Sequence, residues 1–289
     1  MSEGGQGWRH RTWASAEGLT LHARDYAAAE GKARLPVICL HGLTRNARDF
    51  DVLAPWIAAR GRRVLAVDVR GRGLSDRDPA ASYWQPRYAD DVHRLAQALG
   101  LARAVFIGTS MGGLITMELA AHAPDLIAAA IINDVGPVLA REGVARIGAY
   151  VGNAPVFGSW DEAVLYLQRQ NEAALPHYRD GDWRRMAERM FRAEGDRVAA
   201  DYDPAIAAAF ATAPLPADPW ERWHGLASAR PLLLLRGGLS DLLTAADATR
   251  MVTEHPHARL REIPNVGHAP MLDEPEALAA IGQFLDEVD

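Results

Sequence analysis

The sequence predicts an α/β fold, with a mostly parallel central sheet of about eight strands, flanking helices and an inserted helical cap. Apolar runs with the length of buried strands alternate with segments of helical spacing in the first half of the chain, and the alternation resumes near its end. Because parallel strands need crossover connections, this alternation indicates a sheet covered by helices on both faces. Between the two alternating regions lies a long stretch of helical segments, which indicates the insertion.

The expected elements of the sheet follow in order along the chain. A hairpin comes first, with strands at residues 8–15 and 19–26 and a turn at Glu17-Gly18. Four further strands are expected at residues 37–40, 64–68, 104–107 and 126–133. The helices between them are expected around residues 47–60, 88–99 and 114–120. Two late strands, one that starts at Pro231 and one that ends at Ile263, complete the sheet.

The alternation stops after Asn133, and no convincing strand pattern follows from about Gly136 to Leu226. Within this stretch, helices are expected at residues 163–174, 181–193 and 203–211. The first is opened by the capping box Ser159-Trp160-Asp161-Glu162.

The return from this stretch to the sheet is irregular, since it contains Pro214, Pro216 and Pro219. We therefore expect a core of residues 1–135 and 227–289, and a helical cap of residues 136–226 inserted after the sixth strand.

The most informative motif is Gly108-Thr109-Ser110-Met111-Gly112, which lies between an apolar strand and a helix. A strand can pass directly into a helix only through a tight, strained corner, and glycines permit that close approach. Ser110 is then held at the corner with its hydroxyl exposed at a helix N-terminus, as in a nucleophile elbow. Taken alone, the motif is also compatible with a simple Gly/Ser-rich turn.

Three other segments decide between these interpretations. His41-Gly42-Leu43 follows an early strand, the turn Gly238-Leu239-Ser240-Asp241 follows a late one, and Gly267-His268 comes after the last. The order serine, acid, histidine is that of the α/β-hydrolase triad. Residues 68–75 add the pattern Asp-x-Arg-Gly-x-Gly-x-Ser that many members carry. Over its whole length the chain therefore resembles the α/β-hydrolase superfamily.

The resemblance implies a role for each residue of the triad. Ser110 is the expected nucleophile, and His268 is the expected base because it is the only histidine in a Gly-His loop in the right order. Asp241 is the preferred acid, since most members place the acid after the strand that precedes it here. Asp134, after the sixth strand, is the alternative that a minority of members use; otherwise we expect it to anchor the start of the cap.

The resemblance also implies an oxyanion hole and a substrate pocket. Backbone N–H groups of Leu43 and Met111 are the expected oxyanion donors, and His41 is expected to brace the loop. The pocket should lie between triad and cap, with wall residues Leu242, Leu243 and Met271 flanking the acid and the base. Cap aromatics, among them Trp160 and Trp183, are further candidates, although aromatics at helical spacing more often pack in a core. Arg45 is a candidate contact for a substrate carboxylate, or a solvated side chain.

The expected activity is hydrolysis of carboxylic esters, or of lactones, through an acyl-enzyme. Aspartate-dependent dehalogenases and epoxide hydrolases are excluded because the elbow carries Ser110. Carbon–carbon hydrolases of aromatic ring-cleavage products share the triad but usually carry His-Gly-x-Gly-Pro-Gly, where this chain has residues 41–46 as His-Gly-Leu-Thr-Arg-Asn. Cofactor-free haloperoxidase activity, or a non-enzymatic ligand receptor on the same fold, are the remaining alternatives.

Composition limits the partners. The 289 residues carry a formal net charge of -6 and no basic run, so neither nucleic acid nor an anionic membrane is an expected partner. Cys39 is the only cysteine, and no metal-ligand spacing or dinucleotide fingerprint is present, so no cofactor and no metal are expected. No apolar segment approaches membrane-spanning length. We expect a cytoplasmic enzyme for a small-molecule ester or lactone; its oligomeric state is left open.

Overall fold

The computed structural model describes residues 7–31, 33–212, 217–227 and 230–288, and within these ranges it confirms the predicted α/β fold. Eight strands form the central sheet, in the order β1-β2-β4-β3-β5-β6-β10-β11. Their bounds are β1 Arg9–Ala14, β2 Thr20–Tyr26, β3 Val37–Leu40, β4 Val64–Asp68, β5 Ala104–Thr109, β6 Ile127–Asn133, β10 Leu232–Gly237 and β11 Ala258–Ile263. The hairpin β1–β2 is antiparallel and pairs antiparallel with β4, whereas β4 to β11 run parallel to one another.

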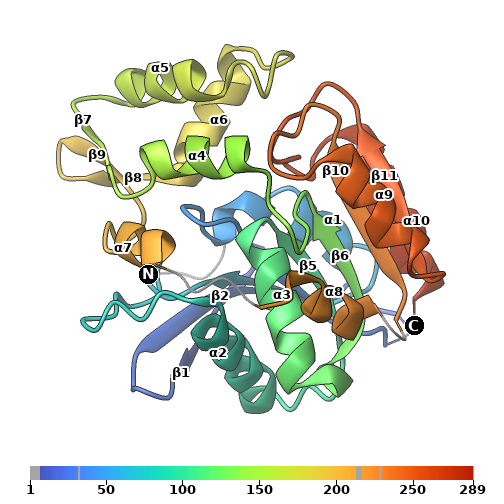
Figure 1. Ribbon diagram of the computed structural model, residues 1–289. Coiled ribbons are helices and arrows are strands. Elements are labelled where there is room, and N and C mark those ends of the chain that lie inside the picture. Colours follow the sequence, from blue (N-terminus) through green and yellow to red (C-terminus); the bar gives the residue numbers. More distant parts are fainter. Residues whose placement is uncertain (1–6, 32, 213–216, 228–229, 289) are drawn as a thin grey trace.

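Helices cover the sheet on both faces (Figure 1). The helices of the core are α1 Leu53–Ala58, α2 Gln85–Ala98, α3 Met111–His122, α8 Pro219–Ala227, α9 Ala245–Thr253 and α10 Pro275–Glu287, with short 3-10 helices at Ala47–Phe50 and Pro124–Leu126. On one face α3 packs against both α2 and α8, and Trp223 on α8 donates to the Met251 carbonyl of α9 at 3.1 Å. On the other face α1 packs on α10, where a Cβ at Gly282 would lie 3.1 Å from the Trp56 ring.

The central strands are apolar along their whole length because both of their faces are covered. Every residue of β3, β4 and β6 is buried, so these strands do not alternate between apolar and polar residues. β5 and β6 are parallel neighbours, so their carboxyl ends lie side by side at one edge of the sheet. Ser110 directly follows β5 and Asp134 directly follows β6 at this edge. That edge carries the candidate site.

The segment expected to be a helical cap also contains strands, so the expectation of helices alone is wrong. Its helices are α4 Arg141–Tyr150, α5 Trp160–Asn171, α6 Asp180–Met190 and α7 Ile206–Thr212, and Figure 1 shows α4, α5 and α6 gathered on one side of the central sheet. A small antiparallel sheet of order β7-β9-β8 joins them, with β7 Val156–Phe157, β8 Phe191–Glu194 and β9 Arg197–Ala200. These strands have two to four residues, too few for a period-two pattern to register in the sequence.

Other details of this region follow the sequence more closely. The Ser159 hydroxyl accepts the Glu162 N–H at 3.2 Å, as expected for the start of α5. Pro214 and Pro216, in the expected irregular return, lie outside the described residues. The return ends in α8, which packs against α3 of the core. No helix in the described ranges combines the length and the apolar character needed to cross a membrane.

Candidate active site

The strand-to-helix corner expected at Ser110 is present between β5 and α3. Ser110 has φ +51° and ψ -114°, a conformation that a side-chain-bearing residue rarely adopts. A Cβ at Gly108 would lie 2.4 Å from the Gly112 backbone, and one at Gly112 would lie 2.0 Å from the Leu40 carbonyl oxygen. Only glycine fits either position, so the motif holds the corner tight and points Ser110 away from the sheet.

Ser110, His268 and Asp134 form one chain of hydrogen bonds. His268 Nε2 lies 2.9 Å from Ser110 Oγ, and His268 Nδ1 lies 2.9 Å from Asp134 Oδ2. A carboxylate beside Nδ1 favours the tautomer in which Nδ1 donates, which leaves Nε2 free to accept the serine proton. Asp134 is fully buried, and 8% of the His268 side chain is exposed. In this arrangement the imidazole has a fixed orientation and could accept the proton of the serine hydroxyl.

The expectation that Asp241 orients His268 is wrong in the structure. Asp241 receives two hydrogen bonds from Arg146 of α4, at 2.5 Å from Nε and 2.8 Å from Nη2. This guanidinium holds the pKa of the Asp241 carboxyl below its usual range. The Asp241 carboxylate is therefore paired with a cation of the cap. The imidazole instead contacts Asp134, which was the alternative prediction for the acid.

Strand order explains why Asp134 reaches His268. It directly follows β6, the neighbour of β5, so it emerges beside the serine corner. Its backbone N–H donates to the Leu235 carbonyl at 2.8 Å, and its Oδ1 accepts the Gly237 N–H at 2.9 Å. Both contacts are with β10, so neighbouring backbone fixes the carboxylate and leaves Oδ2 for His268.

The two expected oxyanion donors lie at the same corner. Leu43 lines the pocket, and Met111 is the first residue of α3 after Ser110. Across the described ranges, neither N–H donates to a protein acceptor, so both remain available to a bound oxyanion. The loop approaches the serine closely, since a Cβ at Gly42 would lie 3.9 Å from Ser110 Cβ.

His41 and Arg72 hold this loop. His41 Nε2 accepts the Val69 N–H at 3.0 Å and Nδ1 donates to the Gly42 carbonyl at 2.7 Å, so the ring braces the loop as expected. Burial lowers the pKa of His41 to about 4, which keeps it neutral and unsuited to be the base. Arg72 was not among the predicted site residues, yet its Nε donates to the Leu43 carbonyl at 2.9 Å.

A pocket opens above Ser110 and His268, between the core and the cap. Of the expected wall residues, only Met271 lines it in the described part of the chain, together with Leu43, one of the expected oxyanion donors. Leu242 and Leu243 are buried in the core, and Trp160 and Trp183 do not border the pocket in the described part of the chain, so these four expectations are wrong. The cap instead contributes aliphatic and aromatic residues of four elements: Ile147, Tyr150, Tyr166, Leu167, Met186, Met190 and Phe191.

Both arginines that line the pocket are paired with carboxylates. Arg45 donates to Asp49 at 2.6–2.9 Å and approaches the Met271 sulfur at 3.8 Å. Arg146 is held by Asp241. Each positive charge is therefore compensated within the protein before any substrate enters.

Comparisons with known proteins show the family to which the chain belongs. The family model described as "Alpha/beta hydrolase family" matches residues 37–281. The chain is 35% identical to the 3-hydroxybutyrate-oligomer hydrolase of Cupriavidus necator, over 86% of this chain and 87% of that protein. It is 28% identical to Esterase YbfF of Escherichia coli, over 93% of this chain and the whole of that protein. The crystal structure of an alpha/beta hydrolase from Novosphingobium aromaticivorans superposes with a TM-score of 0.92 at 43% identity, covering 99% of this chain and 100% of that one.

The matched residues span the strand before Ser110, the serine corner and the histidine loop, and the solved relative shares the fold over nearly the whole chain. On these grounds the chain belongs to the alpha/beta hydrolase family and is a hydrolase.

Proposed function

We propose that the protein hydrolyses carboxylic esters through an acyl-enzyme formed on Ser110. The observation that carries the proposal is the unbroken hydrogen-bond chain from Ser110 through His268 to Asp134, at the floor of an apolar-lined pocket. A serine hydroxyl is a weak nucleophile at neutral pH and needs a base in contact with it. The 2.9 Å approach of His268 Nε2 provides that base.

In the first half of the reaction, Ser110 Oγ attacks the ester carbonyl while its proton passes to His268 Nε2. Asp134 stabilises the imidazolium that forms. The carbonyl oxygen becomes an oxyanion, which the N–H groups of Leu43 and Met111 hold. When the tetrahedral intermediate collapses, the C–O bond breaks and His268 returns its proton to the leaving alcohol.

In the second half, water replaces the alcohol. His268 Nε2 takes a proton from the water as its oxygen attacks the acyl carbon, and the same two N–H groups hold the second oxyanion. Collapse breaks the bond between the acyl carbon and Ser110 Oγ, and the proton on His268 passes to the serine. The products are a carboxylic acid and free enzyme.

The charges of the pocket favour an uncharged acyl group. Arg45 and Arg146 already hold carboxylates of the protein, so a substrate carboxylate has no unpaired cation to meet among the described lining residues. A carboxylate buried without a partner costs several kcal/mol. Carbon–carbon hydrolysis is disfavoured for the same reason, because the carboxylated ring-cleavage products need such a cation.

The test is a substrate panel of neutral p-nitrophenyl esters of increasing acyl length, lactones, and carboxylated vinylogous diketones. We include 3-hydroxybutyrate oligomers because the relative from Cupriavidus necator is named for them. Burst kinetics with a p-nitrophenyl ester, and a mass increase of the acyl group on Ser110, are expected for an acyl-enzyme. Hydrolysis of the diketones alone contradicts the proposal.

A further inference from the structure

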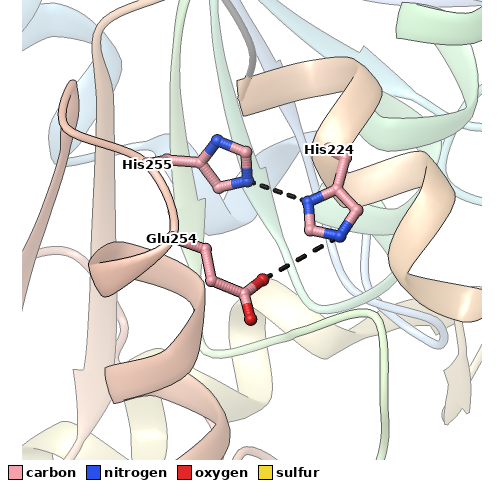
Figure 2. A group of neighbouring side chains, drawn as sticks. All are labelled: His224, Glu254 and His255. Atoms are coloured by element: carbon pink, nitrogen blue, oxygen red, sulfur yellow. Dashed lines mark hydrogen bonds and ion pairs between the residues drawn. The ribbon is translucent and has the colours of Figure 1, made fainter.

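A second cluster of titratable side chains lies where the end of α8 meets the end of α9 (Figure 2). His224 is in the last turn of α8, and Glu254 and His255 directly follow α9. Their ligand atoms, one from each side chain, all lie within 4.8 Å of one another. None of the three lines the pocket beside Ser110 in the described part of the chain, so the proposed ester hydrolysis leaves the cluster without a role.

The two imidazoles already have the spacing of ligands to one ion. His224 Nδ1 and His255 Nε2 are 3.0 Å apart and face each other in Figure 2. Zinc–nitrogen bonds of ~2.0–2.1 Å in a tetrahedral site place neighbouring ligand atoms ~3.3 Å apart. Only a few tenths of an ångström separate the two values.

Glu254 supplies the third donor. Its Oε2 lies 3.9 Å from His224 Nε2, the nitrogen that does not face His255, so the carboxylate must swing toward the two facing nitrogens to share an ion. Its side chain is 35% exposed and that of His224 is 45% exposed, which leaves room for this rotation and for an entering ion. The other carboxylate oxygen accepts from Arg250 Nε at 2.7 Å, so a bound ion shares Glu254 with this arginine.

Buried aromatic rings back both histidines. The Trp220 ring lies 6.2 Å from the His224 ring, and the Trp223 ring lies 5.9 Å from the His255 ring, measured between centroids. Both tryptophans are buried. Packed neighbours of this kind restrict the orientation of the imidazoles, and ligands that are already oriented lose less entropy on binding an ion.

We propose that His224, Glu254 and His255 form a site for one divalent transition-metal ion, with water completing its coordination shell. Two imidazoles and one carboxylate suit zinc, nickel or copper better than magnesium or calcium, which prefer oxygen ligands alone. No metal was predicted because the three residues do not form a ligand spacing that is recognisable along the chain. His224 and His255 are 31 residues apart and meet only through the packing of α8 on α9.

A bound ion would link α8 directly to the end of α9, in addition to the polar contacts that already hold α8 in place. Trp223 of α8 bonds to Met251 of α9, and Arg222 of α8 pairs with Glu118 of α3 at 2.9 Å. An ion bound only by the folded chain stabilises that fold by mass action. The expected effect is therefore on stability, with the rate of ester hydrolysis unchanged.

The experiment titrates the full chain, free of affinity tag and treated with EDTA, with Zn²⁺ in a calorimeter and with Cu²⁺ by tryptophan fluorescence. We expect one Zn²⁺ per chain, a higher Tm with zinc, and quenching of the emission by Cu²⁺. His224→Gln and His255→Gln should each raise the Kd for zinc at least ~10-fold. His257→Gln, at an exposed histidine two residues beyond the cluster, is the matched control and should bind as the parent does.

Glu254→Gln keeps the two facing imidazoles and should also weaken zinc binding. This variant provides a second test of the site in case a histidine variant fails to fold. Equal ester turnover of the metal-free variants and parent checks their folding independently of the metal. The proposal is overturned if the parent shows no saturable zinc binding. It is also overturned if the Kd is the same in the parent, His224→Gln, His255→Gln and Glu254→Gln, since the pair is then a hydrogen bond between histidines only.

Discussion

Asp134 and Asp241 follow adjacent strands of one sheet, yet the two carboxylates have different partners. Asp134, after β6, is fully buried and is shared between His268 and the Gly237 N–H. Asp241, after β10, is one-third exposed and faces Arg146 of the cap. The first carboxylate is fixed by the backbone of the core, whereas the second depends on a long side chain from the inserted segment.

This difference indicates which of the two carboxylates can orient the imidazole of a catalytic base. An orienting carboxylate must keep its geometry while the imidazole gains and loses a proton. Asp134 meets this need because its backbone and one oxygen are tied to β10. Asp241 lies between the core and the cap. Its ion pair with Arg146 connects these two parts of the molecule and compensates a positive charge in the pocket.

Replacing Ser110, the proposed nucleophile, should lower the activity most, whichever carboxylate orients His268. Ser110→Ala removes the nucleophile and should lower kcat for a p-nitrophenyl ester by ~10⁴- to 10⁶-fold, the scale found when a triad nucleophile is deleted. Ser240→Ala, in the turn that carries Asp241, is the control and should retain most of the activity. If the Ser110→Ala protein keeps a tenth of the parent kcat, with contaminating esterase excluded, the site lies elsewhere.

The comparison of the acids is tested directly by two isosteric changes. Asp134→Asn should lower kcat by ~10⁴-fold, because an amide beside Nδ1 favours the wrong tautomer of His268. Asp241→Asn should change kcat less than ~10-fold, because Asp241 does not contact the imidazole. Steady-state kinetics of both proteins show which variant loses more of its kcat, and circular dichroism verifies that both are folded. A larger loss in Asp241→Asn would show that Asp241 is the acid that orients His268.

The sequence was sufficient to predict the fold and to select Ser110 and His268, two residues of the observed hydrogen-bond chain, because these predictions depend on local patterns. Gly108 and Gly112 mark the corner by themselves, since no side chain fits at either position. His268 follows from its place in a Gly-His loop near the end of the chain. The alternation of apolar runs with helices likewise predicts the eight-stranded sheet.

The acid and the pocket could not be predicted in this way, because both depend on contacts between distant segments. Asp134 and Asp241 each follow a buried strand, and contacts with distant residues separate their roles: Asp134 lies 2.9 Å from His268, whereas Asp241 pairs with Arg146 at 2.5–2.8 Å. Leu242 and Leu243 flank that acid in sequence but point into the core. The residues that line the pocket from the cap, such as Tyr150 and Phe191, belong to elements whose packing no local pattern specifies.

The pairing of Asp241 with Arg146 should also affect which substrate charge the pocket accepts. The parent should cleave neutral esters with a kcat/KM at least ~100-fold above that for a carboxylated ring-cleavage product, a gap of about 2.7 kcal/mol in activation free energy. Asp241→Asn leaves Arg146 without its carboxylate, so this variant should accept the anionic substrate better and narrow the gap. The test is to measure kcat/KM for both substrates with the parent and with Asp241→Asn. If the parent prefers the anionic substrate, or if the ratio of the two kcat/KM values is the same in Asp241→Asn, the charge of Arg146 does not select the substrate.

The smallest expected effect is on stability, and it depends on pH. The Arg146 guanidinium lowers the pKa of Asp241 in the folded protein, so their pairing stabilises the fold above the unfolded carboxyl pKa of about 3.9 and loses that contribution as the pH falls through the lower folded value. Because both side chains are about one-third exposed, solvent screens the pair and its contribution should be no more than ~1 kcal/mol.

Arg146→Gln should therefore lower the Tm by at most ~2–4 °C at pH 7, and by progressively less as the pH is lowered toward 3. Thermal melts of parent, Arg146→Gln, Asp241→Asn and the double variant measure the coupling, and a coupling that persists at pH 3 as strongly as at pH 7 would show that the pair is not held by charge.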